Sequence, residues 1–446
     1  MNTPISDFVR SYAASKALRL HMPGHKGKGP LGVEERDITE IGGADVLYQS
    51  EGIIRQSEDN AAQLFGAGRT LYSTEGSSLC IRAMIYLAML HARAAGCTPK
   101  IAAGRNAHKT FLTACALLDA EVEWLYPETA ALLSCPVTPE QVEAAVKGPQ
   151  GATAVFVTSP DYLGHQTDIA ALAAVCHRYG ALLLVDNAHG AYLRFLAPSR
   201  HPMDLGADLC CDSAHKTLPV LTGGAYLHIS GEVPMELTRQ AESAMALFAS
   251  TSPSYLILQS LDEANPYLER DLPSLLPPLC RRVEALKASL TAQGWTLTGE
   301  EPLKLTLAPK ACGYRGTEVA GYLEEQDIIC EFADPDFLVL MFTPQLPDWA
   351  FDKLEKALLS LPRREAITEP SPHLTRPRQV CSPREALLAP QETLPLEQCR
   401  GRVLAAPTVS CPPAVPILIC GEEISEDAIR CFRYYGMDRC TVVRPL

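Results

Sequence analysis

A lysine that follows a serine and a histidine lies near the middle of the chain, in the segment DSAHKT (212–217). Upstream, the apolar run 181–185 ends in Asp186, and such a short run after a helical pattern is typical of a buried parallel strand. A lysine amine can form a Schiff base with the aldehyde of pyridoxal phosphate (PLP), and a carboxylate can hold the proton of its pyridinium nitrogen. We therefore interpret Lys216 and Asp186 as a cofactor-binding pair. The alternative is a surface lysine and a helix-capping aspartate.

Alternating apolar strands and helices must position this pair. Strand patterns at 70–73, 100–104, 153–158, 181–185 and 222–229 alternate with helical patterns such as 79–90 and 168–179. This order predicts an α/β fold with a mostly parallel, doubly wound sheet, in which ligands bind at the carboxyl ends of the strands. A smaller α+β domain and a C-terminal α+β domain follow. The predicted divisions are an N-terminal segment (1–60), a large domain (61–264), a small domain (265–361), a linker (362–378) and a C-terminal domain (379–446).

Two further junctions between a strand and a helix carry polar side chains. The turn TEGSS (74–78) follows a strand and precedes a long helix, so its hydroxyls and the exposed N–H groups could bind a phosphate. An ordinary helix N-cap is the alternative, because serine and threonine are favoured there in any case. His108 follows the strand 100–104 and could stack on an aromatic cofactor, although a single histidine in a loop is usually structural.

Charge and composition exclude several classes of function. The 446 residues carry a net charge of -13, with a pI of about 5.4, which argues against nucleic acid or an anionic membrane surface as a partner. No apolar stretch reaches the roughly 20 residues needed to span a bilayer, and the N-terminus lacks the pattern of a secretory signal. We expect a soluble cytoplasmic protein. The 16 cysteines are scattered without C-x-x-C spacing, which predicts buried thiols and no metal site.

The order of these segments resembles that of the Orn/Lys/Arg decarboxylase family, which are fold-type I PLP enzymes, in its short bacterial form without an N-terminal wing domain. The resemblance runs nearly end to end, and its motifs are HMPGHKG (21–27), DVLYQSEGII (45–54), TEGSS (74–78), RNAHKT (105–110), TSPDYLG (158–164), VDNAHG (185–190), SAHKT (213–217), STSPSY (250–255) and CPPAVPILICGEEI (411–424). Any one of these motifs is a weak signal, whereas this many in the family's order is a strong one.

The resemblance implies a role for each matching residue. Lys216 would carry the cofactor, Asp186 would hold its ring nitrogen, and His108 would stack on its ring. The residues implied around the phosphate and beside the ring are Gly76, Ser77, Ser78, Ser213, His215 and His189. Family dimers share their active sites, so Thr251 or Ser252 would reach the cofactor phosphate of the neighbouring subunit in a homodimer.

The implied reaction is decarboxylation of arginine, lysine or ornithine to agmatine, cadaverine or putrescine. The side-chain cation needs an acidic partner, for which Asp161, Glu331 and Glu422 are candidates. Glu75 stands where the family usually has Asn, and Asp161 where it has Thr; Ala414 and Cys420 replace a Gly and a Pro. The substrate therefore stays open. Two alternatives are an aminotransferase or aldol-type lyase on the same fold, and a PLP-binding protein without turnover.

Overall fold

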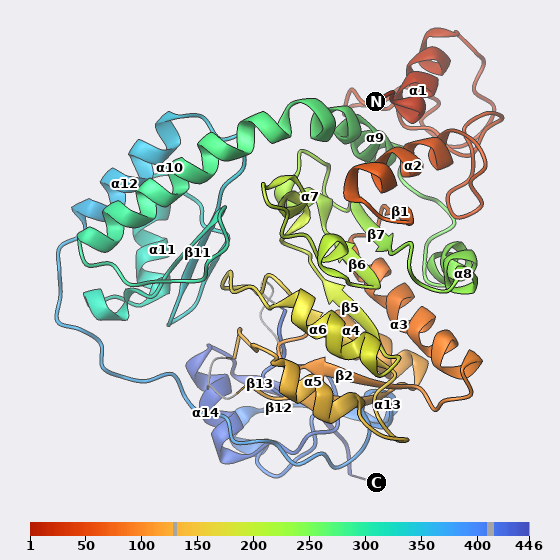
Figure 1. The fold of residues 1–446 in the computed structure, drawn as a ribbon. Coiled ribbons are helices and arrows are strands. Elements are labelled where there is room, and N and C mark those ends of the chain that lie inside the picture. Colours follow the sequence, from red (N-terminus) through yellow and green to blue (C-terminus); the bar gives the residue numbers. More distant parts are fainter. Residues whose placement is uncertain (128–131, 408–413, 446) are drawn as a thin grey trace. The chain divides into compact units, whose positions relative to one another are not determined.

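The computed structural model of the chain describes residues 1–127, 132–407 and 414–445 (Figure 1). Residues 411–413, which begin the predicted tail motif, lie outside the described residues. The chain forms two compact units. The first contains Met1–Lys100, Val142–Ser159 and Asp168–Pro277, and the second contains Ile101–Gln141, Pro160–Thr167 and Pro278–Leu446. The predicted domain boundaries stay a prediction.

The first unit is an α/β arrangement. Its strands are β1 (Arg69–Ser73), β4 (Ala154–Thr158), β5 (Leu182–Asp186), β6 (Leu209–Asp212) and β7 (Ala225–Ile229). Its helices are α1 (Pro4–Ala14), α2 (Ile53–Phe65), α3 (Ser77–Ala94), α6 (Ile169–Arg178), α7 (Ala214–Thr217), α8 (Met235–Ala246) and α9 (Tyr255–Arg270), with 3-10 turns η1 (Ala191–Phe195) and η2 (Pro202–Leu205). Helices α5 (Pro139–Val146) and α10 (Leu272–Ala292) each have residues in both units.

The main sheet of the chain has seven strands, and those of the first unit follow the order β1-β7-β6-β5-β4. Strands β4, β5 and β6 are parallel, and Asp186 pairs with Cys211 in register. Strand β7 runs antiparallel to both β6 and β1. The sheet is therefore mostly parallel, as predicted, with an antiparallel edge. This edge arises because only the one-turn helix α7 separates β6 from β7, whereas a parallel return needs a longer crossover.

Local sequence explains the elements that hold the site. Strand β5 is buried along its whole length, which accounts for its run of leucine and valine without polar alternation. Helix α3 packs against β1, β5, β6 and β7 with a buried apolar stripe. Helix α6 begins where the Asp168 carboxylate accepts a hydrogen bond from Ala171 N at 3.0 Å. The apolar strand β5, the packing of α3 and the N-cap of α6 together fix where the carboxyl ends of β5 and β6 lie.

The second unit contains two smaller sheets and the remaining strands β2 (Lys100–Gly104) and β3 (Glu121–Leu125), with α4 (Lys109–Leu118). A four-stranded antiparallel sheet, in the order β10-β11-β9-β8, is formed by β8 (Leu297–Thr298), β9 (Lys304–Leu307), β10 (Phe332–Ala333) and β11 (Leu338–Met341). Its companions are η3 (Pro309–Cys312), α11 (Gly316–Glu324) and α12 (Trp349–Ser360). This part is the predicted smaller α+β arrangement.

The C-terminal part of the second unit is also α+β. Its elements are α13 (Pro383–Leu388), β12 (Gln391–Pro395), η4 (Leu396–Gln398), α14 (Glu426–Tyr434) and β13 (Arg439–Val443), and β12 pairs antiparallel with β13. Leu404, Leu418, Ile424 and Phe432 are fully buried in a core of their own. The cysteines of the described residues are free, and most are buried, which confirms the predicted thiols. Among the same residues, no helix is both long and apolar enough to cross a bilayer.

Candidate active site

Lys216 lies on α7, directly after the carboxyl end of β6. Strand β6 ends at Asp212, Ser213 precedes the helix, and the half-buried side chain of Lys216 follows on its only turn. Its Nζ atom lies 3.0 Å from Nε2 of His189, which belongs to the loop after β5. The lysine and histidine that the sequence predicts around the cofactor ring are therefore neighbours in the first unit.

Asp186 is the last residue of β5 and is only 3% exposed. Its Oδ1 atom accepts hydrogen bonds from Ala188 N at 3.2 Å and from the thiol of Cys211 at 3.6 Å. Burial raises the pKa of Asp186, and the nearby Lys216 ammonium opposes that rise. A buried carboxylate in this position is stabilised by a cationic or protonated partner, which is what a pyridinium N–H provides. The sequence does not reveal the contact from Cys211, because the two residues are 25 positions apart.

The turn before α3 brings hydroxyls and backbone N–H groups together. Gly76 has a φ of 71°, which favours glycine, and its N–H donates to Gly223 O at 2.7 Å. The hydroxyl of Ser213 donates to that of Ser77 at 2.8 Å, so residues from the start of α3 and the end of β6 meet here. Ser78 lies in the first turn of the same helix. The donors at this helix start suit an anion such as a phosphate.

His215 lies beside the same turns. Its backbone N–H and its Nδ1 atom contact Gly224 O at 3.2 and 3.0 Å. Burial lowers the pKa of His215, the hydrogen bond to Gly224 O opposes this change, and the nearby Lys216 adds to it. A neutral ring whose Nδ1–H donates to a carbonyl keeps Nε2 as an acceptor.

The carboxylate of Glu75 binds the loop between α8 and α9. Its exposed carboxylate accepts a hydrogen bond from Ser250 N at 2.7 Å, and Ser252 N donates to Ser250 Oγ at 3.1 Å. Glu75 therefore orders the loop that carries the exposed residues Thr251 and Ser252.

His108 belongs to the second unit. It precedes α4, and its Nδ1 atom accepts a hydrogen bond from Thr110 N at 3.2 Å, so the side chain caps the helix. This fixes the orientation of the imidazole through its Nδ1 edge. The stacking of its face on a cofactor ring stays a prediction.

The three acidic candidates for substrate recognition also lie in the second unit, and they differ in what already binds them. Asp161 accepts hydrogen bonds from two backbone N–H groups and from His165 Nδ1 at 3.0 Å. Glu422 is buried, 3.1 Å from an Nη atom of Arg105, and accepts Ile419 N at 2.8 Å. Glu331 is exposed, and its Oε1 atom accepts the Tyr162 hydroxyl at 2.8 Å. Glu331 is thus the candidate least engaged by the protein itself.

The fold and the composition of the site define a class. A lysine follows one strand of a mostly parallel α/β sheet, a buried aspartate ends the next strand, and a serine-lined turn begins α3. This is the architecture of fold-type I PLP enzymes. The structures of constitutive lysine decarboxylase from E. coli and lysine decarboxylase A from Pseudomonas aeruginosa each have a TM-score of 0.78 and 19% identity to this chain. They cover 99% and 97% of it, and it covers 82% and 75% of them.

The chain belongs to the Orn/Lys/Arg decarboxylase family. The family's major domain matches residues 3–298, and its C-terminal domain matches residues 369–440. The arginine decarboxylases of Bacillus subtilis and Halalkalibacterium halodurans are both 29% identical to it. The alignments cover 96% and 97% of this chain, and 92% and 93% of those proteins. The enzyme class is therefore that of the amino-acid decarboxylases, a family that in general depends on PLP.

Proposed function

We propose that this enzyme decarboxylates a basic amino acid, namely arginine, lysine or ornithine, with PLP bound covalently at Lys216. The observation that carries the proposal is the arrangement at the carboxyl ends of β5 and β6. Asp186 is buried at the end of β5. Nζ of Lys216, which follows β6, lies 3.0 Å from Nε2 of His189, which follows β5. Family membership supports the reaction class.

The residues present fit this cofactor. A buried carboxylate can hold the ring nitrogen, an amine can bind the aldehyde, and paired hydroxyls at the start of α3 can bind the phosphate. Bound there, the cofactor supplies an electron sink for the pair of electrons released when CO2 leaves. The side chains of this protein would provide binding, orientation and proton transfer.

Each side chain then has a specific task. Asp186 holds a proton at the ring nitrogen, because an ionised carboxylate raises the pKa of a cationic partner. His189 exchanges a proton with Nζ of Lys216, which it already contacts. Ser77 and Ser213, whose hydroxyls contact each other, would hold the phosphate. His108 would cover the other face of the ring, and Thr251 or Ser252 would complete the phosphate site of a second subunit.

We propose Glu331 as the residue that recognises the side-chain cation of the substrate. It is exposed, and among the described residues it has no ion pair, whereas Glu422 is paired with Arg105 and Asp161 is bound within its own turn. A carboxylate whose second oxygen is available can bind an ammonium or guanidinium directly. The relatives named arginine decarboxylase favour a guanidinium.

Glu75 and Asp161 differ from the residues usual in the family, but their contacts do not favour a protein without turnover. Glu75 orders the Ser250 loop, and Asp161 orders the turn to His165, so neither substitution removes a residue from the core chemistry. Family membership weighs against an aminotransferase or an aldol-type lyase. Decarboxylation therefore remains as the function that the site supports best.

The test is release of CO2 from arginine, lysine and ornithine, assayed in parallel with purified protein and added PLP. We expect turnover of one of the three and, after borohydride reduction, a cofactor adduct on Lys216 by peptide mass spectrometry. Lys216→Ala should lose both signals, while Lys147→Ala, which changes an exposed lysine directly after α5, serves as the control. Turnover or a covalent adduct that persists in Lys216→Ala would contradict the proposal. A Glu331→Gln variant with an unchanged KM would contradict its assigned role.

A further inference from the structure

A second buried carboxylate lies behind Asp186, at the end of the neighbouring strand. Asp212 ends β6 and is fully buried, and its Oδ2 atom lies 2.9 Å from Nε2 of His201 and 3.2 Å from Nε2 of His228. Its Oδ1 atom accepts a hydrogen bond from Nδ2 of Asn187 at 2.7 Å. Nδ1 of His228 in turn lies 2.9 Å from the hydroxyl of Thr70. None of these residues entered the sequence-based site.

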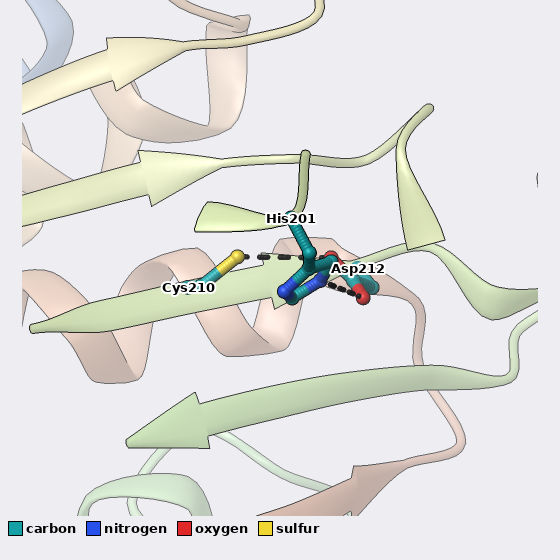
Figure 2. A group of neighbouring side chains, drawn as sticks. All are labelled: His201, Cys210 and Asp212. Atoms are coloured by element: carbon teal, nitrogen blue, oxygen red, sulfur yellow. Dashed lines mark hydrogen bonds and ion pairs between the residues drawn. The ribbon is translucent and has the colours of Figure 1, made fainter. Parts of the chain in front are cut away.

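Hydrogen bonds link the members of this cluster. The ligand-type atoms of His201, Cys210 and Asp212 lie within 4.8 Å of one another (Figure 2), a spacing that metal ligands can also adopt. However, Nδ1 of His201 accepts a hydrogen bond from Met203 N at 3.3 Å. With Nδ1 as the acceptor, Nε2 carries the hydrogen and donates it to Asp212. The contacts of the cluster are therefore those of a hydrogen-bond network.

Asp212 is therefore an anion held in the interior. Burial alone would raise its pKa, but the contacts with His201 and His228 outweigh burial and hold the pKa of Asp212 well below its usual range. At neutral pH the carboxylate keeps its charge, and it accepts hydrogen bonds from four side chains, those of Asn187, His201, His228 and Cys210. Such a fixed charge in a region of low dielectric acts on its neighbours more strongly than it would in water.

Asp186 is one of the neighbours on which this charge acts. In the register of β5 and β6, Asp186 pairs with Cys211, so Asp212 is the next residue along. Asn187 directly follows Asp186, and it joins the two strand ends through its N–H to Cys211 O at 2.9 Å and its amide to Asp212. After burial and the contacts already described, the Asp212 charge adds to the rise in the pKa of Asp186.

We propose that Asp212 is a positioning residue whose fixed negative charge strengthens the hold of Asp186 on the proton of the cofactor's ring nitrogen. This inference rests on the proposed function, because it assigns the ring nitrogen to Asp186. Two like charges at adjacent strand ends repel each other, and a proton shared between Asp186 and the ring relieves that repulsion. Asp212 does not contact the reacting atoms and acts only through Asp186.

The experiment measures the ring nitrogen itself. PLP labelled with nitrogen-15 in the ring is bound to the wild-type protein and to Asp212→Asn, and the nitrogen chemical shift is followed by NMR as the pH is raised. We expect the wild-type ring to stay protonated and the apparent pKa of the ring nitrogen to fall by about one unit in the variant, which is a tenfold weaker hold on the proton. An unchanged nitrogen shift in a folded Asp212→Asn protein overturns the proposal.

Two further variants separate the charge from its surroundings. Asp208→Asn removes another buried carboxylate, at the opposite end of β6, where it binds His177 and Leu183 N. This variant should leave the nitrogen shift at its wild-type value. The double variant Asn187→Asp with Asp212→Asn keeps the shape and the total charge and leaves a carboxylate beside Asp186, so it should restore the protonated signal. If Asp212→Asn does not fold, the double variant decides: a wild-type signal supports the proposal, and a deprotonated ring overturns it.

Failure of this inference is distinct from failure of the proposed function. If the wild-type protein forms no adduct between PLP and Lys216, the proposed function itself is wrong. If the wild-type adduct forms with a protonated ring and all variants match it, the function stands and only the role of Asp212 is wrong. Unfolding midpoints of the variants identify any loss of signal that arises from instability.

Discussion

The amine of Lys216 and the imidazole of His189 approach to 3.0 Å, although they follow different strands of the sheet. The histidine comes from the loop after β5, and the lysine comes from the single turn of α7 after β6. Because β5 and β6 are parallel neighbours, their carboxyl ends open onto the same edge of the sheet. The contact therefore depends on the strand order rather than on proximity in sequence.

Replacement of His189 should slow the chemistry without removing the cofactor. We expect His189→Gln to reduce kcat on the order of a hundredfold, the effect of losing a proton-transfer group next to the reacting amine. The measurement is CO2 release together with the cofactor content of the purified variant. His177→Gln, which changes an exposed histidine on α6, is the control and should keep wild-type turnover. Equal rates for His189→Gln and wild type would remove His189 from the proposed site.

Asp186→Asn should keep the shape of the site but weaken its hold on the ring nitrogen. We expect a loss of about 3 kcal/mol of transition-state stabilisation, by analogy with the removal of other preorganised groups. Near-normal turnover of this variant would contradict the assignment. The ratio of kcat/KM between wild type and variant measures the effect, and bound PLP is quantified separately to show that the adduct still forms.

The hydroxyls of Ser77 and Ser213 should act together on the phosphate. They contact each other at 2.8 Å, so removal of either one disturbs the other. We expect Ser77→Ala and Ser213→Ala each to raise the Kd for PLP roughly tenfold, since a hydrogen bond to a charged group contributes about 1.5–3 kcal/mol. The double variant should lose less than the sum. Strict additivity in a titration of the apo-protein would indicate that the two hydroxyls bind independently.

The replacement of the family's glycine by Ala414 has a measurable cost. Ala414 has a φ of 56°, in the left-handed region, and its carbonyl accepts Lys109 N at 2.9 Å. The left-handed region costs a residue with a Cβ about 1–2 kcal/mol, and glycine avoids this cost. Glycine also has a freer unfolded state, which offsets part of the gain. Ala414→Gly should therefore stabilise the protein by about 0.5–1 kcal/mol. Thermal unfolding tests this. A lower midpoint for the glycine variant would show that the backbone is not strained here.

Asp262 should make stability depend on pH in the acidic range. Burial raises the pKa of Asp262 from 3.8 to about 6, although the Ser57 hydroxyl and Ser6 N donate to its oxygens. The folded state thus binds the proton more tightly than the unfolded state. As the pH rises from about 4 to about 6, this group lowers the free energy of unfolding by roughly 3 kcal/mol.

The variant Asp262→Asn isolates this contribution. Its amide oxygen can accept Ser6 N and its NH2 group can donate to Ser57, so the site remains hydrogen-bonded without a titrating group. The difference in unfolding free energy between variant and wild type, measured with urea, should rise across that pH range in favour of the variant. A constant difference would mean that Asp262 titrates alike in the folded and unfolded states.

Much of the fold was predictable because apolar runs and polar turns are local signals. The strand that ends at Asp186, the turn before α3 and the segment of Lys216 all lie where the patterns placed them. The antiparallel direction of β7 was not predictable in this way, since periodicity gives burial but not strand direction.

The network around Asp212 was missed for a related reason. His201 and His228 are isolated residues in the sequence, and neither lies within a pattern that suggests a partner. They meet one carboxylate only because β6 and β7 are adjacent and the η2 turn folds back on them. The contacts of Glu75 and Glu422 could not be predicted for the same reason. Their partners, Ser250 and Arg105, are far away in sequence.

The ion pair between Arg105 and Glu422 has a consequence for the order of biosynthesis. The two residues are 317 positions apart, and the guanidinium also donates to the carbonyls of Pro416 and Ile417. A buried guanidinium without its carboxylate costs about 3–5 kcal/mol. Until residues 416–422 have been synthesised, the guanidinium of Arg105 lacks all three of these acceptors. The second unit can therefore adopt its native packing around Arg105 only after that segment has been made, and a nascent chain that stops before it leaves a buried charge without its partner.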